Sequence, residues 1–195
     1  MTEPITLDPA KTALLIMDMQ NGIVGRYADP AQIIGRLQAA KAAAAKAGVT
    51  VAYVRLGFTD EDYAAIPARN KAFSQIGADR NFTNDSPASQ IVERLAPGDS
   101  DIVVRKTRYG AFSTTDLAGQ LEQRGIDTLV LSGIATSGIV LSTVRDAADR
   151  DYKLYVLSDG CADRDPQVHE VLLEKVFPRQ ADVIDVDRFV SALTE

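Results

Sequence analysis

Short continuous apolar runs alternate along this chain with longer stretches in which apolar residues recur every three or four positions. A continuous run is typical of a strand buried on both faces, and the longer spacing is typical of an amphipathic helix. Strands that alternate with helices form parallel βαβ units, so the pattern predicts an α/β fold around a parallel sheet. The expected strands are Thr12–Met17, Val49–Leu56, Asp101–Val104, Thr128–Leu131, Lys153–Leu157 and Asp182–Val186.

Capping residues mark where helices between these strands begin and end. Asp29 and Pro30 have the form of an N-cap followed by proline at the first helical position, and Gly48 ends that helix. The segment 113–116, Ser-Thr-Thr-Asp, has the spacing of a capping box and would open a helix that runs to Gly125. We also expect a helix over Pro87–Leu95, one from Asp165-Pro166 to Phe177, and a terminal helix capped by Asp187.

Two charged residues follow directly after expected strands. Asp18 follows the first strand, and Lys106 lies just beyond the third. Ligands bind at the carboxyl ends of the strands in open parallel sheets, so both side chains are candidates for chemistry. An ammonium group beside a carboxylate keeps the carboxylate ionised or holds a negative oxygen of a substrate. The alternatives are that Asp18 caps the following turn and that Lys106 is solvated, and we expect Gln20 to orient Asp18 or the turn.

A tight turn at Ser132-Gly133 joins the fourth expected strand to the next helix. The backbone N–H groups of the segment from Thr136 through Ser137 to Ile139 would point out of the helix start, where they can hold an anion or a developing oxyanion. The alternative is a plain connection between a strand and a helix.

Three segments resemble, in the same order, motifs of the isochorismatase-like hydrolase family, also called cysteine hydrolases. LLIMDMQN (Leu14–Asn21) resembles its first-strand motif, RKTRYGAFSTTDL (Arg105–Leu117) its lysine segment, and GIATSGIV (Gly133–Val140) its nucleophile turn. The resemblance extends to Asp163. It implies a single domain over residues 1–195 with a three-layer αβα, Rossmann-like fold and a six-stranded, mainly parallel sheet.

The resemblance also implies roles for individual residues. Asp18 and Lys106 match the family's catalytic pair, and a non-proline cis peptide bond would fall at Ile134-Ala135, where it would orient oxyanion donors. The position of the nucleophilic cysteine holds Ile139. An aliphatic side chain cannot attack a carbonyl, so the family's thioester route is closed here.

Three interpretations remain open. The first is a hydrolase of an amide or vinyl ether that uses Asp18 as acid and base and water as the nucleophile, as isochorismatases of the family do without a cysteine. Those enzymes typically carry glycine where this chain has Ile139 and tryptophan where it has Thr107, which argues against isochorismate itself. In the second, Thr136, Ser137, Ser142 or Cys161 replaces the thiol. The third is a binding protein that kept the pocket without the chemistry.

The segment Gly57–Ser86 lacks periodicity and is rich in polar and turn-forming residues. Such long connections are usually functional or mobile. We expect it to form a wall or lid of the pocket, in the same subunit or a neighbouring one; the alternative is a surface insertion with a short helix around Ala68–Gln75. The residues that we expect to line the pocket are Gln20, Phe58, Tyr109, Thr136 and Ser137.

Composition narrows the function further. Two residues bear on metals and disulfides: His169 is the only histidine and Cys161 the only cysteine among 195 residues, which predicts neither a disulfide framework nor a metal site. We expect His169 to be a surface or interface residue. No G-x-G-x-x-G motif follows the first strand, so we expect no dinucleotide cofactor.

Charge and hydropathy indicate the partners and the compartment. The net charge of −6 argues against nucleic acid and anionic membranes as partners, and no apolar run is long enough to span a bilayer. We expect a small-molecule substrate and a cytoplasmic protein. From the family resemblance we also expect a homo-oligomer, a dimer or a tetramer.

Overall fold

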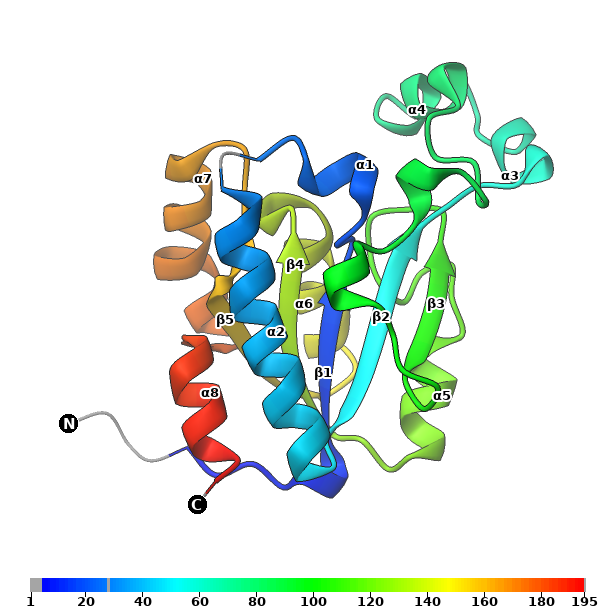
Figure 1. The fold of residues 1–195 in the computed structure, drawn as a ribbon. Coiled ribbons are helices and arrows are strands. Elements are labelled where there is room, and N and C mark those ends of the chain that lie inside the picture. The colour runs from blue at the N-terminus through cyan, green and yellow to red at the C-terminus, as the bar shows by residue number, and fades with distance from the viewer. Residues whose placement is uncertain (1–4, 28, 195) are drawn as a thin grey trace.

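The structure, a computed structural model, describes residues 5–27 and 29–194. Within these ranges one six-stranded sheet has the order β3-β2-β1-β4-β5-β6, and every neighbouring pair is parallel (Figure 1). Helices cover both faces of the sheet, so the predicted three-layer α/β fold is confirmed. The strands are β1 (Thr12–Met17), β2 (Thr50–Leu56), β3 (Ile102–Lys106), β4 (Thr128–Ile134), β5 (Lys153–Ala162) and β6 (Asp182–Ile184).

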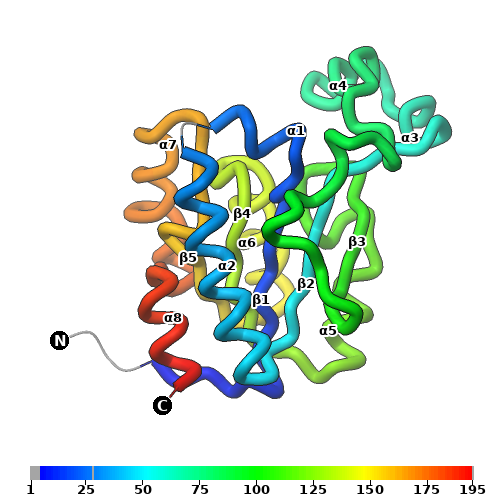
Figure 2. Tube along the Cα trace, viewed as in Figure 1, coloured from blue at the N-terminus to red at the C-terminus, as the bar shows by residue number. Residues whose placement is uncertain are grey.

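The helices divide between the two faces of the sheet. Helices α2 and α8 pack side by side on one face, and α5 and α6 cover the other (Figure 2). The helices of the described residues are α1 (Asn21–Val24), α2 (Pro30–Ala47), α3 (Asp60–Ala64), α4 (Phe73–Asp79), α5 (Leu117–Gln123), α6 (Leu141–Ala148), α7 (Pro166–Val171) and α8 (Val186–Ala192).

Strand β1 is a central strand, and all six of its residues are buried. Its side chains alternate between the two faces, as the period of two in a strand requires. Leu15 and Met17 belong to the apolar cluster under α5 and α6, whereas Leu14 and Ile16 belong to the cluster under α2 and α8. This two-sided burial explains why the strand reads as a continuous apolar run.

The register brings the functional candidates to one edge of the sheet, which we call the carboxyl edge. Met17 pairs with Gly133 between β1 and β4, and Leu56 pairs with Lys106 between β2 and β3. The segments that follow β1 and β4 therefore leave the sheet next to each other, with the end of β3 two strands away from β1.

One predicted helix does not form, and the starts of two others are wrong. The region Pro87–Leu95 forms two short 3₁₀ turns, because Ile91 between them is extended and pairs with Gln20. The expected capping box at 113–116 does not form, and α5 begins later, with Asp116 as an N-cap whose side chain makes no capping hydrogen bond. The cap of α8 is Asp185, which accepts a hydrogen bond from the N–H of Arg188.

The helix after Asp165 is correctly capped but less regular than predicted. The Asp165 carboxylate accepts hydrogen bonds from the N–H groups of Gln167 and Val168. Helix α7 ends at Val171 and continues as a π-helical turn and then a 3₁₀ turn to Arg179.

The segment 57–86 projects beyond the carboxyl edge and carries α3 and α4 (Figure 1). The expected helix at Ala68–Gln75 lies too early, because α4 begins at Phe73. A hydrophobic cluster holds the segment together and joins it to the end of β2; it consists of Phe58, Tyr63, Phe73 and Phe82 with Leu56 of β2. No helix of the described residues is both long and apolar enough to cross a membrane.

Candidate functional site

Asp18 and Lys106 meet at the carboxyl edge. The Lys106 Nζ atom lies 2.8 Å from Asp18 Oδ2, and the two side chains are 3% and 8% exposed, respectively. Lys106 also donates a hydrogen bond to the carbonyl oxygen of Arg108 at 3.0 Å. Asp18 and Lys106 are 88 positions apart in the sequence, and the parallel sheet brings them into contact.

The surroundings of Asp18 decide its protonation. Asp18 has a left-handed backbone with φ of 55°, and its N–H donates to the carbonyl of Val54 at 2.8 Å. Burial raises the pKa of the Asp18 carboxyl above its ordinary value, against the opposing effect of the Lys106 charge. Asp18 Oδ1 is buried and has no hydrogen-bond partner among the residues that the structure describes. A carboxylate oxygen without a partner is costly in a fold and useful to a ligand.

The Gln20 side chain joins the end of β2 to the 3₁₀ turn Pro87–Ser89. Its amide nitrogen donates to the carbonyls of Leu56 and Ser89, both at 2.7 Å, and its oxygen accepts from the N–H of Leu56 at 2.7 Å. Both amide N–H groups are therefore used by the backbone, and the side chain is fully buried. The geometry fits the expected orienting role in the turn and leaves no N–H for a substrate.

The turn after β4 has an unusual backbone. The Ile134–Ala135 peptide bond is cis, at the position that the resemblance implies. Gly133 has φ of 128°, and a β-carbon there would collide with the backbone of Met17. Glycine is therefore required where β4 passes the end of β1.

Two amides of this turn already have partners inside the protein. The Ser137 N–H donates to Asp163 Oδ2 at 2.7 Å, and the Gly138 N–H donates to the carbonyl of Ala135 at 3.0 Å. The start of this helical segment thus does hold an anion, and that anion is the protein's own Asp163. These two amides are not free for a substrate oxyanion in this arrangement, contrary to the expectation for the segment.

Ile139 points into the core. It is 2% exposed and belongs to the apolar cluster between the sheet and α5 and α6. The π-helical turn that carries it spans Thr136–Val140. Hydrocarbon at this position therefore contributes packing.

The two predicted aromatic pocket residues lie in different surroundings. Phe58 is fully buried and stacks on Tyr63 with ring centroids 4.9 Å apart, so it is a core residue of segment 57–86. Tyr109 is half exposed and contacts Phe73 edge-on at 5.1 Å. A β-carbon added at Gly138 would be in van der Waals contact with this ring, so Tyr109 lies between α4 and the turn.

His169 was missed as a contributor to this region. Its Nδ1 atom lies 2.8 Å from the Oγ1 atom of Thr136, a fully buried residue. Burial lowers the pKa of the His169 imidazole, with Asp163 opposing this effect. The order of the elements was the one signal for this contact. Helix α7 begins just after β5, and β5 is the neighbour of β4, which carries the turn.

Cys161 is enclosed rather than reactive. It is buried at the end of β5, and this burial raises the pKa of its thiol to about 12. Reactive cysteines have a lowered pKa, so this thiol is protonated and poorly suited to attack. The described residues contain no group of three or more His, Cys, Asp or Glu side chains that suits a metal ion.

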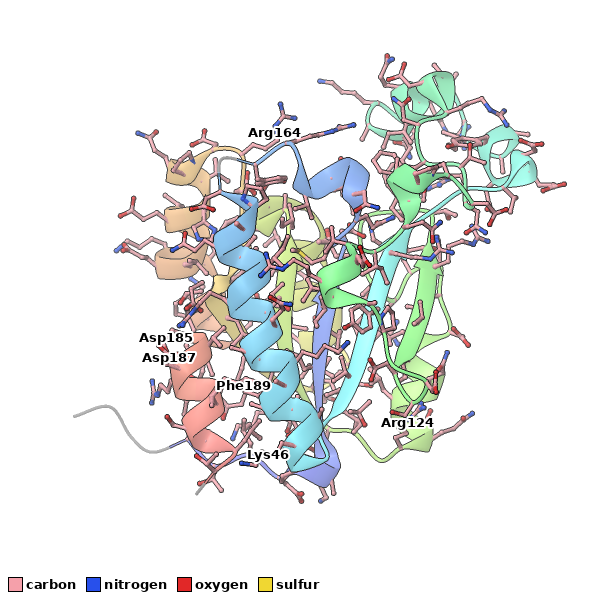
Figure 3. All side chains as sticks on the ribbon, viewed as in Figure 1. Lys46, Arg124, Arg164, Asp185, Asp187 and Phe189 are labelled. Atoms are coloured by element: carbon pink, nitrogen blue, oxygen red, sulfur yellow. The ribbon has the colours of Figure 1, made fainter. Side chains whose placement is uncertain are left out.

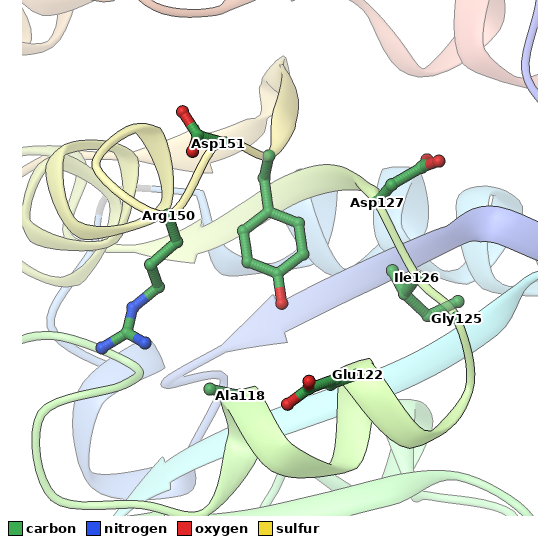
Figure 4. Close-up of a pocket in the computed structure, with 8 residues that line it drawn as sticks. Ala118, Glu122, Gly125, Ile126, Asp127, Arg150 and Asp151 are labelled. Carbon is green, nitrogen blue, oxygen red and sulfur yellow. The ribbon is translucent and has the colours of Figure 1, made fainter.

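Two hollows lie near opposite edges of the sheet. A cavity of about 280 Å³ is bordered by Tyr27, Cys161, Asp163 and His169, close to the carboxyl edge, where Arg164 also projects (Figure 3). Another, of about 480 Å³, lies at the opposite edge. It is lined by Ala118, Glu122, Gly125, Ile126, Asp127, Arg150, Asp151 and Tyr152 (Figure 4).

Known proteins share both the sequence pattern and the fold of this chain. The isochorismatase domain matches residues 12–188. Ureidoacrylate amidohydrolase RutB of Methylobacterium radiotolerans is 33% identical over an alignment of 213 positions, and the match covers 98% of this chain and 83% of that protein.

Solved structures agree with this match. An isochorismatase family protein from Burkholderia thailandensis has a TM-score of 0.83 and 27% identity, and the match covers 99% of this chain and 100% of that one. N-carbamoylsarcosine amidase from Thermoplasma acidophilum has a TM-score of 0.75 and 28% identity, with 91% of this chain and 97% of that chain covered.

Proposed function

The chain belongs to the isochorismatase family, and we propose that it hydrolyses a small metabolite of the amide or vinyl-ether type without a covalent cysteine intermediate. In this proposal Asp18 is the acid and base, and Lys106 is its electrostatic partner. Water is the nucleophile, because Ile139 stands at the position that we align with the family's cysteine.

The observation that carries the proposal is the unpaired oxygen of Asp18. Oδ2 is held by Lys106, while the buried Oδ1 has no partner among the described residues. An oxygen in this state is placed to exchange a proton with a bound molecule. The raised pKa of the Asp18 carboxyl brings its protonation nearer to neutral pH, where an acid–base group is most effective.

The two substrate classes require opposite starting forms of Asp18. For an amide, the ionised carboxylate takes a proton from the attacking water and returns a proton to the departing nitrogen. For a vinyl ether, the protonated carboxyl delivers its proton to the alkene carbon, and water adds to the resulting cation and gives a proton back to the carboxylate. The hemiketal formed then breaks its bond to the ether oxygen, which leaves as an alcohol with that proton, and a carbonyl product remains. In both routes Lys106 stabilises the ionised form of Asp18 or a negative oxygen of the substrate.

Two of the four candidate replacements for the thiol are disfavoured by their surroundings. Cys161 is buried with a raised pKa, and Thr136 is fully buried with its hydroxyl on His169. The Asp18 route therefore needs fewer rearrangements than attack by Cys161 or Thr136 does.

The test is turnover of a panel of ureido acids, simple amides and vinyl ethers. The panel includes ureidoacrylate and N-carbamoylsarcosine, because the names of two similar proteins state these compounds. We expect at least one compound to be hydrolysed, and Asp18→Asn to lower its kcat by about 10²-fold or more, the usual contribution of a general acid or base. The pH profile separates the routes, since kcat/KM rises with pH for the base and falls with pH for the acid.

The matched control is Asp127→Asn at the opposite edge of the sheet. Asp127 also faces a lysine, Lys11 at 3.9 Å, but both side chains are more than half exposed. This variant should keep wild-type turnover. The proposal fails if Asp18→Asn retains full activity, or if Cys161→Ala alone abolishes it. Absence of turnover together with ligand-induced thermal stabilisation would instead indicate a binding protein.

A further inference from the structure

Two side chains from later in the chain hold the turn that follows the cis peptide bond. The His169 imidazole contacts the Thr136 hydroxyl at 2.8 Å, and the Asp163 carboxylate accepts from the adjacent Ser137 N–H at 2.7 Å. His169 comes from α7 and Asp163 from the end of β5. Two consecutive residues of the turn are thus tied to a neighbouring part of the fold.

The turn lies next to Asp18. Met17 and Gly133 are paired in the sheet, so Asp18 and Ile134 are the residues that follow this pair. A rotation of the peptide groups at 134–138 would change which backbone dipoles face Asp18 and any molecule bound there. The orientation of this turn therefore matters to the proposed chemistry.

The partner of Thr136 is chemically specific. Thr136 is fully buried, so its hydroxyl depends on a protein partner for a hydrogen bond. A neutral imidazole carries one donor and one acceptor nitrogen, and the Thr136 hydroxyl can pair with Nδ1 in either tautomer, so the contact fixes the orientation of the ring. Tyr27, Asp29, Asp159 and Asp163 border the same cavity as His169 and are the ionisable side chains around it, apart from the buried Cys161.

We propose that His169 is a positioning residue, which sets the orientation of the turn at 134–138 by holding the Thr136 hydroxyl through Nδ1. This proposal rests on the hydrolase function proposed above. His169 acts through Thr136 and does not touch the reacting atoms. Asp163 holds the next residue of the same turn through the Ser137 N–H. We call the two contacts, from His169 and from Asp163, the clamp.

Two nearly matched variants test the role of Nδ1. Asparagine places its amide where Nδ1 stands, whereas glutamine places its amide nearer to Nε2. We expect His169→Asn to keep most of the wild-type kcat. His169→Gln and Thr136→Val should each lose kcat by roughly 10-fold to 100-fold, the scale of a small misplacement in an active site, with a smaller change in KM. Because both remove one contact, the double variant should be no slower than the slower single variant.

Hydrogen exchange gives a measurement that does not depend on turnover. The amides of residues 136–139 should exchange faster in His169→Gln and Thr136→Val than in the wild type and in His169→Asn. In untagged protein, His169 is the only imidazole, so the ¹⁵N spectrum reports its two ring nitrogens alone, and the Nδ1 signal should shift in Thr136→Val, which removes its hydroxyl partner. Equal exchange and equal kcat in the Asn and Gln variants would overturn the proposal.

The outcomes separate this inference from the hydrolase proposal. If Asp18→Asn keeps full activity while the His169 variants still alter exchange in the turn, the hydrolase proposal fails and the clamp stands as a structural feature only. Suppose that Asp18→Asn abolishes turnover, while in His169→Gln both kcat and the amide exchange of residues 136–139 equal those of the wild type. His169 is then not a positioning residue. Thermal unfolding of each variant checks that a loss of kcat does not come from unfolded protein.

Discussion

Replacing Lys106 by methionine tests how the buried pair is balanced. Methionine has a similar length and fills similar space, but it removes the cation that faces Asp18 at 2.8 Å. The variant leaves a carboxylate that is 6% exposed and has neither oxygen paired with a cation. Because methionine keeps most of the packing, this variant measures the electrostatic contribution of the pair to stability.

The distance gives the expected size of the effect. Two unit charges 2.8 Å apart attract by about 6 kcal/mol at an effective dielectric constant of 20. Part of this offsets the cost of removing both ions from water, and experiments on buried pairs give a net loss of about 3–5 kcal/mol when one partner is removed. We therefore expect Lys106→Met to lower the free energy of unfolding by about 3–5 kcal/mol at neutral pH.

The loss should depend on pH because Asp18 can take up a proton. Its pKa is already raised by burial, and removal of Lys106 takes away the main influence that lowers it. Between the unfolded pKa, about 3.9, and the folded pKa, the folded state then holds the additional proton. The free energy of unfolding of the variant should therefore fall by up to about 1.4 kcal/mol per unit as pH rises through this window, and should recover as pH falls.

Urea unfolding at several pH values between 5 and 8 measures this, with wild type, Lys106→Met, Asp18→Asn and the double variant. The control is Lys11→Met, whose exposed pair with Asp127 at 3.9 Å should contribute no more than about 1 kcal/mol at any pH. The reasoning is refuted if the cost of Lys106→Met does not change with pH, or if the costs of the two single variants simply add in the double variant.

Three further substitutions test the backbone and the hydrogen bonds next to the Asp18–Lys106 pair, and the cap of α8. Gly133→Ala should destabilise the protein by about 3 kcal/mol or more in urea unfolding, because φ is 128° and the new methyl would collide with the backbone of Met17; a well-folded variant with wild-type stability would contradict this. Gln20→Leu should cost about 2–4 kcal/mol through the loss of three buried hydrogen bonds to the backbone, and a midpoint of urea unfolding unchanged from wild type would show that they contribute little. Asp185→Ala should cost about 1 kcal/mol as the loss of a helix cap, more than Asp187→Ala, and the reverse order in thermal unfolding would favour the cap first predicted from sequence.

The sheet could be predicted from the sequence because its central strands are buried on both faces. β1 has the predicted bounds, since Thr12–Met17 is entirely buried and ends at a charged residue. β3 and β5 extend further than predicted, to Lys106 and Ala162. Arg105 and Lys106 at the end of β3 give no apolar signal, and β5 resumes its pairing with β4 at Cys161 after a register shift that the hydrophobic pattern does not show. Hydrophobic pattern therefore locates strands better than it locates their ends.

The misplaced helix boundaries share a physical cause, which is competition from contacts distant in sequence or from the local backbone. Ile91 leaves the expected helix to pair with Gln20, 71 residues earlier. At the expected capping box, the Thr115 hydroxyl bonds to the carbonyl of Ala111 and to the N–H of Leu117, which delays the start of α5. Local spacing carries no information about the first of these contacts and little about the second.

The candidate site was predictable in part. Asp18 and Lys106 could be chosen because residues directly after parallel strands share an edge. The contact between Thr136 and His169 could not be chosen in this way, because it depends on how far α7 tilts toward the turn. A lone histidine on a helix gives no sign of its partner, which only the three-dimensional arrangement of α7 and the turn shows.

Several features at the carboxyl edge are energetically unfavourable for the fold, and they are the strongest reason to look for function there. A buried ion pair is often no more stabilising than well-packed hydrocarbon, so stability alone does not explain why Asp18 and Lys106 are enclosed together. The same few residues add a left-handed aspartate and a carboxylate oxygen without a partner. Unfavourable features of this kind persist where the surrounding fold holds them and where they serve a site. If so, an apolar replacement of both charges should leave the protein at least as stable as either single variant while turnover is lost, and this combination would distinguish a site kept for chemistry from one kept for folding.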